Sequence, residues 1–316
     1  MKDKRKFHGM LFCKKEDFSV NTAEPRKKKW GDRRDAVWVK DVPSLSALLT
    51  NLFPTRTDSE VFAHQEIDVT ELLKFIDSKN GPEAPYKTTM FHCFVTMVAR
   101  VLIERPYLNR FIQGRRFYQR NDITVSFVAK RKFADHSEES LMQYKVQGRH
   151  TVDDVSRLIV GDVKEMREAD GALGLNETID KLAKLPRFVL MFIMRMLRWM
   201  DFWDLVPRDL MKGDSNFSSV LLSNLGSIKC PSVYHHLNNY GSNSIIITIG
   251  TIHKAPVLQS DGSIQIRDVM DIGATLDERI ADGFYFARSL KLIQHICSHP
   301  ELLDRPLEES SQYEFV

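Results

Sequence analysis

Residues 277–283 read Asp-Glu-Arg-Ile-Ala-Asp-Gly, and this stretch decides the fold that we expect. It follows residues 269–276, whose pattern predicts a strand, and it precedes an apolar helical pattern that begins at Phe284. Asp282 and Gly283 therefore open a predicted helix directly after a strand. Earlier in the chain, residues 222–226 read Leu-Ser-Asn-Leu-Gly at the end of another predicted strand.

Strand and helix patterns alternate on both sides of these stretches. Residues 35–57 predict an extended lead-in, because Pro43 and Pro54 interrupt regular structure. Strands are predicted at 61–70, 112–118, 123–130, 141–146, 219–222 and 244–252, and a hairpin is predicted between 257–258 and 264–266. Helices are predicted at 70–78, from Thr88 or Thr89 to before Pro106, at 153–168 and from 283 to about 299. This alternation favours an α/β fold.

The two quoted stretches resemble the family of chloramphenicol acetyltransferase and the dihydrolipoamide acyltransferases, the catalytic domain of 2-oxo acid dehydrogenase complexes. That family carries His-x-x-x-Asp-Gly at a strand-to-helix turn and a Ser-Asn-Leu-Gly-like strand end before it. Residues 66–72, 105–110 and 299–303 agree with the family as well, in the same order along residues 35–305. The resemblance implies a two-layer α/β sandwich with a mixed β-sheet.

The resemblance also implies a reaction. Family members assemble as trimers or larger oligomers, with active sites at subunit interfaces in a channel that takes coenzyme A or its thioester at one end. A histidine acts as the general base, a serine hydroxyl stabilises the oxyanion, and the aspartate fixes the turn. Carried over to this sequence, Ser223 matches the serine, Asp282 the aspartate and Gly283 the glycine.

The histidine position holds Glu278. A glutamate has an unperturbed pKa of about 4.3, which makes it a weak base toward a hydroxyl or thiol unless burial raises that value. Three interpretations stay open: an inactive site that binds a ligand or serves as a scaffold, a working Glu278 base, or a base displaced to His235 or His236. These two histidines follow Ser223 in a segment that lines the acceptor side of the channel in the family. No third metal ligand stands at a recognisable spacing, so we expect no metal.

Composition and charge limit the other possibilities. The 316 residues carry a net charge of +3, and 43% of them are hydrophobic, as in ordinary globular proteins. Residues 1–34 hold 12 Lys and Arg against 5 Asp and Glu, which predicts a basic flexible arm before a domain at 35–305 and an acidic tail at 306–316. No aromatic-interleaved basic groove appears elsewhere, so nucleic acid is an unlikely partner. The four cysteines form no CxxC pair, which favours the cytoplasm.

Residues 185–211 combine many Phe, Met and Trp side chains with arginines. Their longest uncharged run is too short to span a bilayer. A buried core helix, the wall of an apolar tunnel or subunit contact, and an interfacial membrane helix all fit this pattern. Weak contact with a membrane surface, through 185–211 or through the basic arm, is therefore one expected property.

No lipoyl domain or subunit-binding domain is recognised in the sequence, so we expect a stand-alone branch of the family without lipoyl attachment. Its acyl groups would arrive on coenzyme A. The sequence thus predicts a coenzyme A-dependent acyltransferase-like protein of unknown acceptor with an altered base. The alternative is an inactive protein of the same fold.

Overall fold

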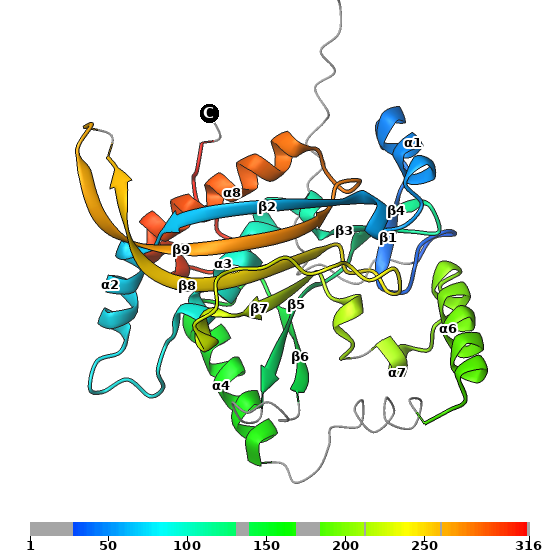
Figure 1. The fold of residues 1–316 in the computed structure, drawn as a ribbon, viewed down its shortest axis with the longest axis horizontal. Coiled ribbons are helices and arrows are strands. Elements are labelled where there is room, and N and C mark those ends of the chain that lie inside the picture. Colours follow the sequence, from blue (N-terminus) through cyan, green and yellow to red (C-terminus); the bar gives the residue numbers. More distant parts are fainter. Residues whose placement is uncertain (1–27, 131–138, 169–183, 212, 260, 315–316) are drawn as a thin grey trace, which may run out of the picture.

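A six-stranded mixed sheet forms the centre of the computed structural model, which describes residues 28–130, 139–168, 184–211, 213–259 and 261–314 (Figure 1). Its strand order is β2-β9-β8-β7-β5-β6. The strands are β2 (Glu60–Asp68), β5 (Ile123–Lys130), β6 (Glu139–Val146), β7 (Val220–Asn224), β8 (Ile245–Leu258) and β9 (Ile264–Asp277). Strand β7 runs parallel to β5 and β8, and the other pairs are antiparallel. The expected α/β fold with a mixed sheet is confirmed.

A second sheet of three strands has the order β1-β4-β3. Its strands are β1 (Ala36–Val39), β3 (Arg110–Gln113) and β4 (Arg116–Arg120). The single strand predicted at 112–118 is wrong, because Gly114 (φ 56°) and Arg115 (φ 61°) take left-handed conformations and fold the chain back as a tight hairpin. The extended lead-in is also wrong in part, because helix α1 (Ser44–Leu52) begins directly after Pro43.

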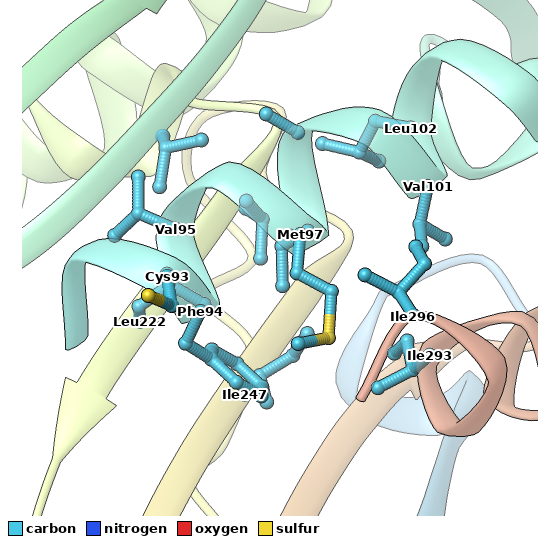
Figure 2. Close-up of a cluster of buried hydrophobic side chains, with 14 of the residues drawn as sticks. Cys93, Phe94, Val95, Met97, Val101, Leu102, Leu222, Ile247, Ile293 and Ile296 are labelled. Carbon is cyan, nitrogen blue, oxygen red and sulfur yellow. The ribbon is translucent and has the colours of Figure 1, made fainter. Parts of the chain in front are cut away.

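One face of the large sheet is covered by α2 (Thr70–Lys79), α3 (Met90–Glu104) and α8 (Gly283–Ser298), with α4 (Val152–Glu168) against α3. Figure 2 shows Phe94 and Met97 of α3 packed among side chains from β7, β8 and α8. Alternate residues of β8 enter this core because side chains of a strand point to opposite faces in turn. Of the two threonines expected to cap α3, Thr89 does so: its hydroxyl accepts from the His92 N–H (3.4 Å). As predicted, α8 begins at Gly283.

Arg100 is the largest side chain that lies fully inside this core. Its guanidinium donates to the carbonyl oxygens of Leu302 (2.7 Å), Arg305 (2.9 Å) and Pro306 (3.0 Å), and also to that of Glu309. A buried guanidinium needs such acceptors, since it cannot lose its charge in a protein. The segment predicted as an acidic tail is thus bonded to α3 over its described part.

The opposite face of the sheet carries a loop, residues 231–239, that joins β7 to β8. The Thr248 hydroxyl donates to the carbonyl of Val233 on this loop. A Cβ added to Gly273 would lie 2.9 Å from the same carbonyl, and one added to Gly250 would lie 2.5 Å from the Ser232 nitrogen. The two glycines therefore let the loop backbone lie directly on the sheet.

Helix α6 (Arg187–Phe202) and the short α7 (Arg208–Met211) stand at one end of the molecule (Figure 1). The interpretation of 185–211 as a buried core helix is wrong for the single chain, because Phe188 is 75% exposed and Phe192 67% exposed. No described helix is both long and apolar enough to cross a membrane. Within the described ranges, five short 3-10 helices occupy residues 57–59, 106–109, 215–217, 226–228 and 300–304.

The domain boundaries stay a prediction. Residues 1–27 of the predicted arm lie outside the described residues. Within the described part, Arg33 is buried and its guanidinium lies 3.3 Å from the Asp201 carboxylate.

Candidate functional site

The turn after β9 is held by one buried ion pair, which joins the two residues that flank Glu278 in the sequence. Arg279 donates to both carboxylate oxygens of Asp277, at 2.8 and 2.7 Å, and Asp277 also accepts from the Ser59 hydroxyl (3.1 Å). Asp277 is 0% exposed and Arg279 3% exposed. The Glu278 N–H donates to the Ser59 carbonyl (3.0 Å), so the backbone at Glu278 is fixed against the start of β2.

The Glu278 side chain is half-buried, and no hydrogen bond or ion pair to its carboxylate occurs among the described residues. Its two charged neighbours are engaged elsewhere. Arg279 is bonded to Asp277 and to the Phe53 carbonyl (2.7 Å), and Asp282 accepts from the Tyr285 N–H (2.7 Å) as the N-cap of α8. The Glu278 carboxylate is therefore available to bind a group that is not among the described residues of its own chain.

Arg56 anchors the loop that carries His235 and His236 by hydrogen bonds to the end of that loop. Its backbone N–H donates to the Asn239 side chain (2.9 Å), and its guanidinium donates to the carbonyls of Ile112 (2.9 Å) and Asn238 (3.3 Å). Burial lowers the pKa of Arg56 to about 10, while the nearby Asp277 and Asp201 carboxylates oppose that shift. No motif in the sequence points to this arginine.

The structure brings His236, but not His235, to a partner near Glu278. The His236 Nδ1 lies 3.1 Å from Glu60 Oε2. Glu60 is paired with Asp277 in the β2–β9 ladder, one residue before Glu278. The ring of His236 is 84% exposed, whereas the Glu60 side chain is 6% exposed. His235 is exposed, and its side chain makes no hydrogen bond, ion pair or ring contact with another described residue. Glu60 has no motif in the sequence and was missed.

Ser223 lies at a different place on the same sheet. It pairs with Thr248 on β8, which pairs with Gly273 on β9, which pairs with His64 on β2. Gly273 precedes Glu278 by five positions, and at about 3.3 Å per residue this is roughly 16 Å along the strand. The Ser223 hydroxyl, like the Glu278 carboxylate, has no hydrogen-bond partner within the described ranges. One chain therefore does not bring the two groups together.

Three further side chains could hold a cation. Ligand atoms of Glu66, His253 and Asp271 all lie within 4.8 Å of one another on β2, β8 and β9. A β-bulge between Ile249 and Ile252 places one extra residue in β8 and so turns His253 to the face of Asp271. Sequence spacing does not reveal this group, because each ligand comes from a different strand. Nothing further in the structure identifies an ion for it.

A cavity of about 440 Å³ is lined by Glu66 and by neighbouring residues of β2, β8, β9 and α8. Two further cavities among the described residues lie away from these side chains. The larger, about 680 Å³, is lined by Lys79, Tyr86, Asp153, Arg157 and neighbours beside α2 and α4. Lys79 is already paired there with Asp153 (3.0 Å) and Asp304. The smaller, about 50 Å³, is an apolar gap between α3, α8 and the sheet. Neither is lined by Ser223, Glu278 or His236.

Comparison with known proteins agrees with the resemblance seen in the sequence. Residues 208–304 match the model of the 2-oxoacid dehydrogenases acyltransferase (catalytic domain). The lipoamide acyltransferase component of the branched-chain alpha-keto acid dehydrogenase complex of Bacillus subtilis is 23% identical over 288 residues. That match covers 88% of this chain and 56% of the relative, so the chain spans little more than half of the relative's length.

Solved structures share the fold at low sequence identity. The dihydrolipoamide acetyltransferase of Azotobacter vinelandii superposes with a TM-score of 0.56 at 14% identity, covering 84% of this chain and 93% of that one. That structure comes from work on a serine, a histidine and an asparagine in its catalytic mechanism. A chloramphenicol acetyltransferase superposes with a TM-score of 0.51 at 14% identity, covering 83% and 99%. The expected resemblance is confirmed: the chain has the fold of these acetyltransferases, and its residues 208–304 match the acyltransferase catalytic domain of the 2-oxoacid dehydrogenases.

Proposed function

We propose that this protein transfers an acyl group from a coenzyme A thioester to an acceptor at a site shared by two copies of the chain. Ser223 of one copy would face Glu278 of the next. The observation that carries the proposal is the separation of these two groups along the sheet, with neither group hydrogen-bonded to another described residue. A homotrimer or larger ring supplies such a meeting point, since a rotation that closes brings different surfaces of neighbouring copies together.

In this proposal the Glu278 carboxylate takes the proton from the attacking thiol or hydroxyl of the acceptor. The attacking atom bonds to the thioester carbonyl carbon, and the carbonyl oxygen becomes an oxyanion that accepts a hydrogen bond from the Ser223 hydroxyl. Collapse of this intermediate breaks the carbon–sulfur bond and releases coenzyme A, which takes up the proton from Glu278. Asp282 contributes by capping α8 and so fixing the turn.

His236 is the second candidate for the base. Its Nδ1 is bonded to Glu60, and Glu60 pairs with Asp277, the residue before Glu278. A carboxylate on one ring nitrogen leaves the other nitrogen to accept a proton, as in other carboxylate-oriented histidines. His235 lacks such a partner among the described residues, so we assign it no proton-transfer role. We place the protein in the cytoplasm, in keeping with the free thiols of Cys93, Cys230 and Cys297.

The first test is isothermal titration with coenzyme A and with acetyl-coenzyme A, paired with a thioester-cleavage assay that uses dihydrolipoamide as acceptor. Binding with turnover is expected. Glu278→Gln should then lower the rate by at least about 100-fold, as for loss of a general base, while His236→Gln should have a small effect. The reverse ranking would move the base to His236.

Binding without turnover would favour the alternative of an inactive ligand-binding protein. In that case Glu278→His becomes decisive, because turnover created by this change would show that only the base is missing. Absence of binding to either ligand would contradict the acyltransferase proposal and favour a scaffold.

The shared site is tested by co-expressing two inactive variants, Ser223→Ala and Glu278→Gln. If each site takes Ser223 and Glu278 from different copies, about a quarter of the sites in mixed oligomers carry both native groups and activity returns to about that level. A mixture as inactive as its parents would contradict the shared site.

A further inference from the structure

Helix α6 exposes an apolar stripe, and the charged side chains that α6 itself exposes are all positive. Phe188, Phe192 and Trp199 are 75, 67 and 57% exposed, and their spacing places them on one face of the helix. The exposed charged residues of α6 are Arg187, Arg195 and Arg198. Its single acid, Asp201, is buried. An exposed stripe of this kind marks an interaction site rather than chance exposure.

The helix is anchored through that one buried acid. Asp201 accepts from the Arg33 guanidinium (3.3 Å), the Gln113 amide (2.9 Å) and the Gly241 N–H (2.8 Å). These bonds hold the C-terminal end of α6 against the second sheet and leave its aromatic face outward. The orientation of the stripe is therefore fixed by the fold.

The basic N-terminal segment reaches the body beside α6. Lys28 lies 3.7 Å from the Asp204 carboxylate, and the Arg34 guanidinium donates to the Asp204 carbonyl (3.0 Å). The preceding residues 1–27 hold 8 Lys and Arg against 4 Asp and Glu. Residues 28–34 and the aromatic helix, which the sequence places far apart, thus share one region of the molecule.

Helix α1 adds a second apolar stripe at the same end of the molecule (Figure 1). Leu45, Leu48 and Leu52 of α1 are all more than 60% exposed. The turn at Gly114 and Arg115 connects α1 to α6: Arg115 donates to the Asn51 side chain (3.1 Å), and a Cβ on Gly114 would lie 3.0 Å from the Phe202 carbonyl. We call α1, this turn, α6 and residues 28–34 the basic apolar end.

We propose that the basic apolar end docks on an anionic lipid bilayer. Phe, Trp and Leu side chains at this end would enter the boundary between headgroups and acyl chains, and the arginines would meet lipid phosphates. Self-pairing of α6 between two copies is a poorer arrangement, because it would oppose arginines to arginines and α6 exposes no acid to meet them. A contact of α6 with a different face of a neighbouring copy is the competing outcome that the test below separates.

Cosedimentation with vesicles tests the proposal directly. The full chain should pellet with vesicles of phosphatidylcholine and phosphatidylserine and stay in the supernatant with phosphatidylcholine alone. Phe192→Ser with Trp199→Ser should lower the partition coefficient by at least about 10-fold, because both rings leave the bilayer. Leu258→Ser with Ile264→Ser is the matched control, since these side chains are equally exposed (71 and 70%) at the tip of the β8–β9 hairpin, and it should bind as the native chain does.

Charge is tested separately. Arg195→Gln with Arg198→Gln should weaken binding to anionic vesicles by about fivefold per arginine at low salt and less at 1 M salt. Equal loss in the hairpin-tip control, or no binding of the native chain to anionic vesicles, would overturn the proposal. Light scattering gives the third outcome. If the native chain does not bind vesicles and the Phe192/Trp199 variant changes its oligomeric mass, the stripe is a subunit contact instead.

Discussion

Asp277 and Arg279 form a bidentate buried ion pair that encloses Glu278 in the sequence, with 2.7 Å between Arg279 Nη2 and Asp277 Oδ2. Asp277→Asn leaves the Arg279 charge buried without its counter-ion, and we expect a loss of about 3–5 kcal/mol of unfolding free energy. Chemical denaturation measures it. Lys74→Gln, which breaks an exposed pair with Glu71, is the control and should cost under about 1 kcal/mol. An equally small loss in Asp277→Asn would show that the pair does not hold the turn.

His92 should make stability depend on pH. It lies 6% exposed in α3, its Nδ1 has no hydrogen-bond partner, and burial lowers its pKa from 6.5 to about 4. Between these two values the unfolded chain binds a proton that the folded chain does not, so the unfolding free energy rises with pH from about 4 to 6.5 and then levels. The full effect is about 3 kcal/mol.

His92→Asn should flatten this part of the pH profile. The exposed His235→Gln is its control and should leave the slope unchanged. A slope that survives His92→Asn would assign the effect to other groups.

Gly273→Ala should displace the loop over the sheet. The added methyl would lie 2.9 Å from the Val233 carbonyl and 2.7 Å from the Thr248 hydroxyl, and we expect a cost of about 1–3 kcal/mol. Gly283→Ala is the matched control, because nothing lies within 4 Å of its added Cβ and alanine favours a helix. Thermal unfolding of both variants compares them, and equal melting temperatures would contradict the close approach of the loop.

Asp271→Asn should stabilise the metal-free protein. Asp271 and Glu66 are directly opposed in the β2–β9 ladder, and like charges in that position repel. We expect a gain of about 0.2–1 kcal/mol at low salt, shrinking in 1 M salt as the charges are screened. Glu83→Gln, on an exposed loop, should give no such gain. A loss of stability in Asp271→Asn would mean that the pair is not repulsive.

The sequence predicted the features that depend on neighbouring residues. The β8–β9 hairpin, the helix that starts at Gly283 and the helix that follows Thr89 are all confirmed, because turn residues, capping residues and apolar spacing are local signals. The β3–β4 hairpin was missed because Arg115, rather than a glycine or asparagine, takes the second left-handed position. Helix α1 was missed because Pro43 was interpreted as a break, although proline also precedes helices.

The position of the site residues depends on the pairing register of the strands, which the sequence patterns do not predict. Ser223 and Glu278 were expected in one reaction, and only the ladder from β7 to β9 reveals how far apart one chain holds them. His253 joins Glu66 and Asp271 only because a bulge changes the face on which it points. Glu60, which orients His236, belongs to no motif. Whether Glu278 is the working base stays a prediction.

The four carbonyl groups that surround Arg100 belong to residues 302–309, while Arg100 itself lies in the first third of the chain. During synthesis, α3 leaves the ribosome long before those acceptors exist. Until they arrive, the Arg100 guanidinium has the Glu104 carboxylate of the same helix (3.9 Å) but none of its four carbonyl acceptors, and the core around it is incomplete. The core can therefore be completed only after residues 302–309 have been made. A protease that cuts after residue 300 would separate Arg100 from these acceptors and so destabilise the core.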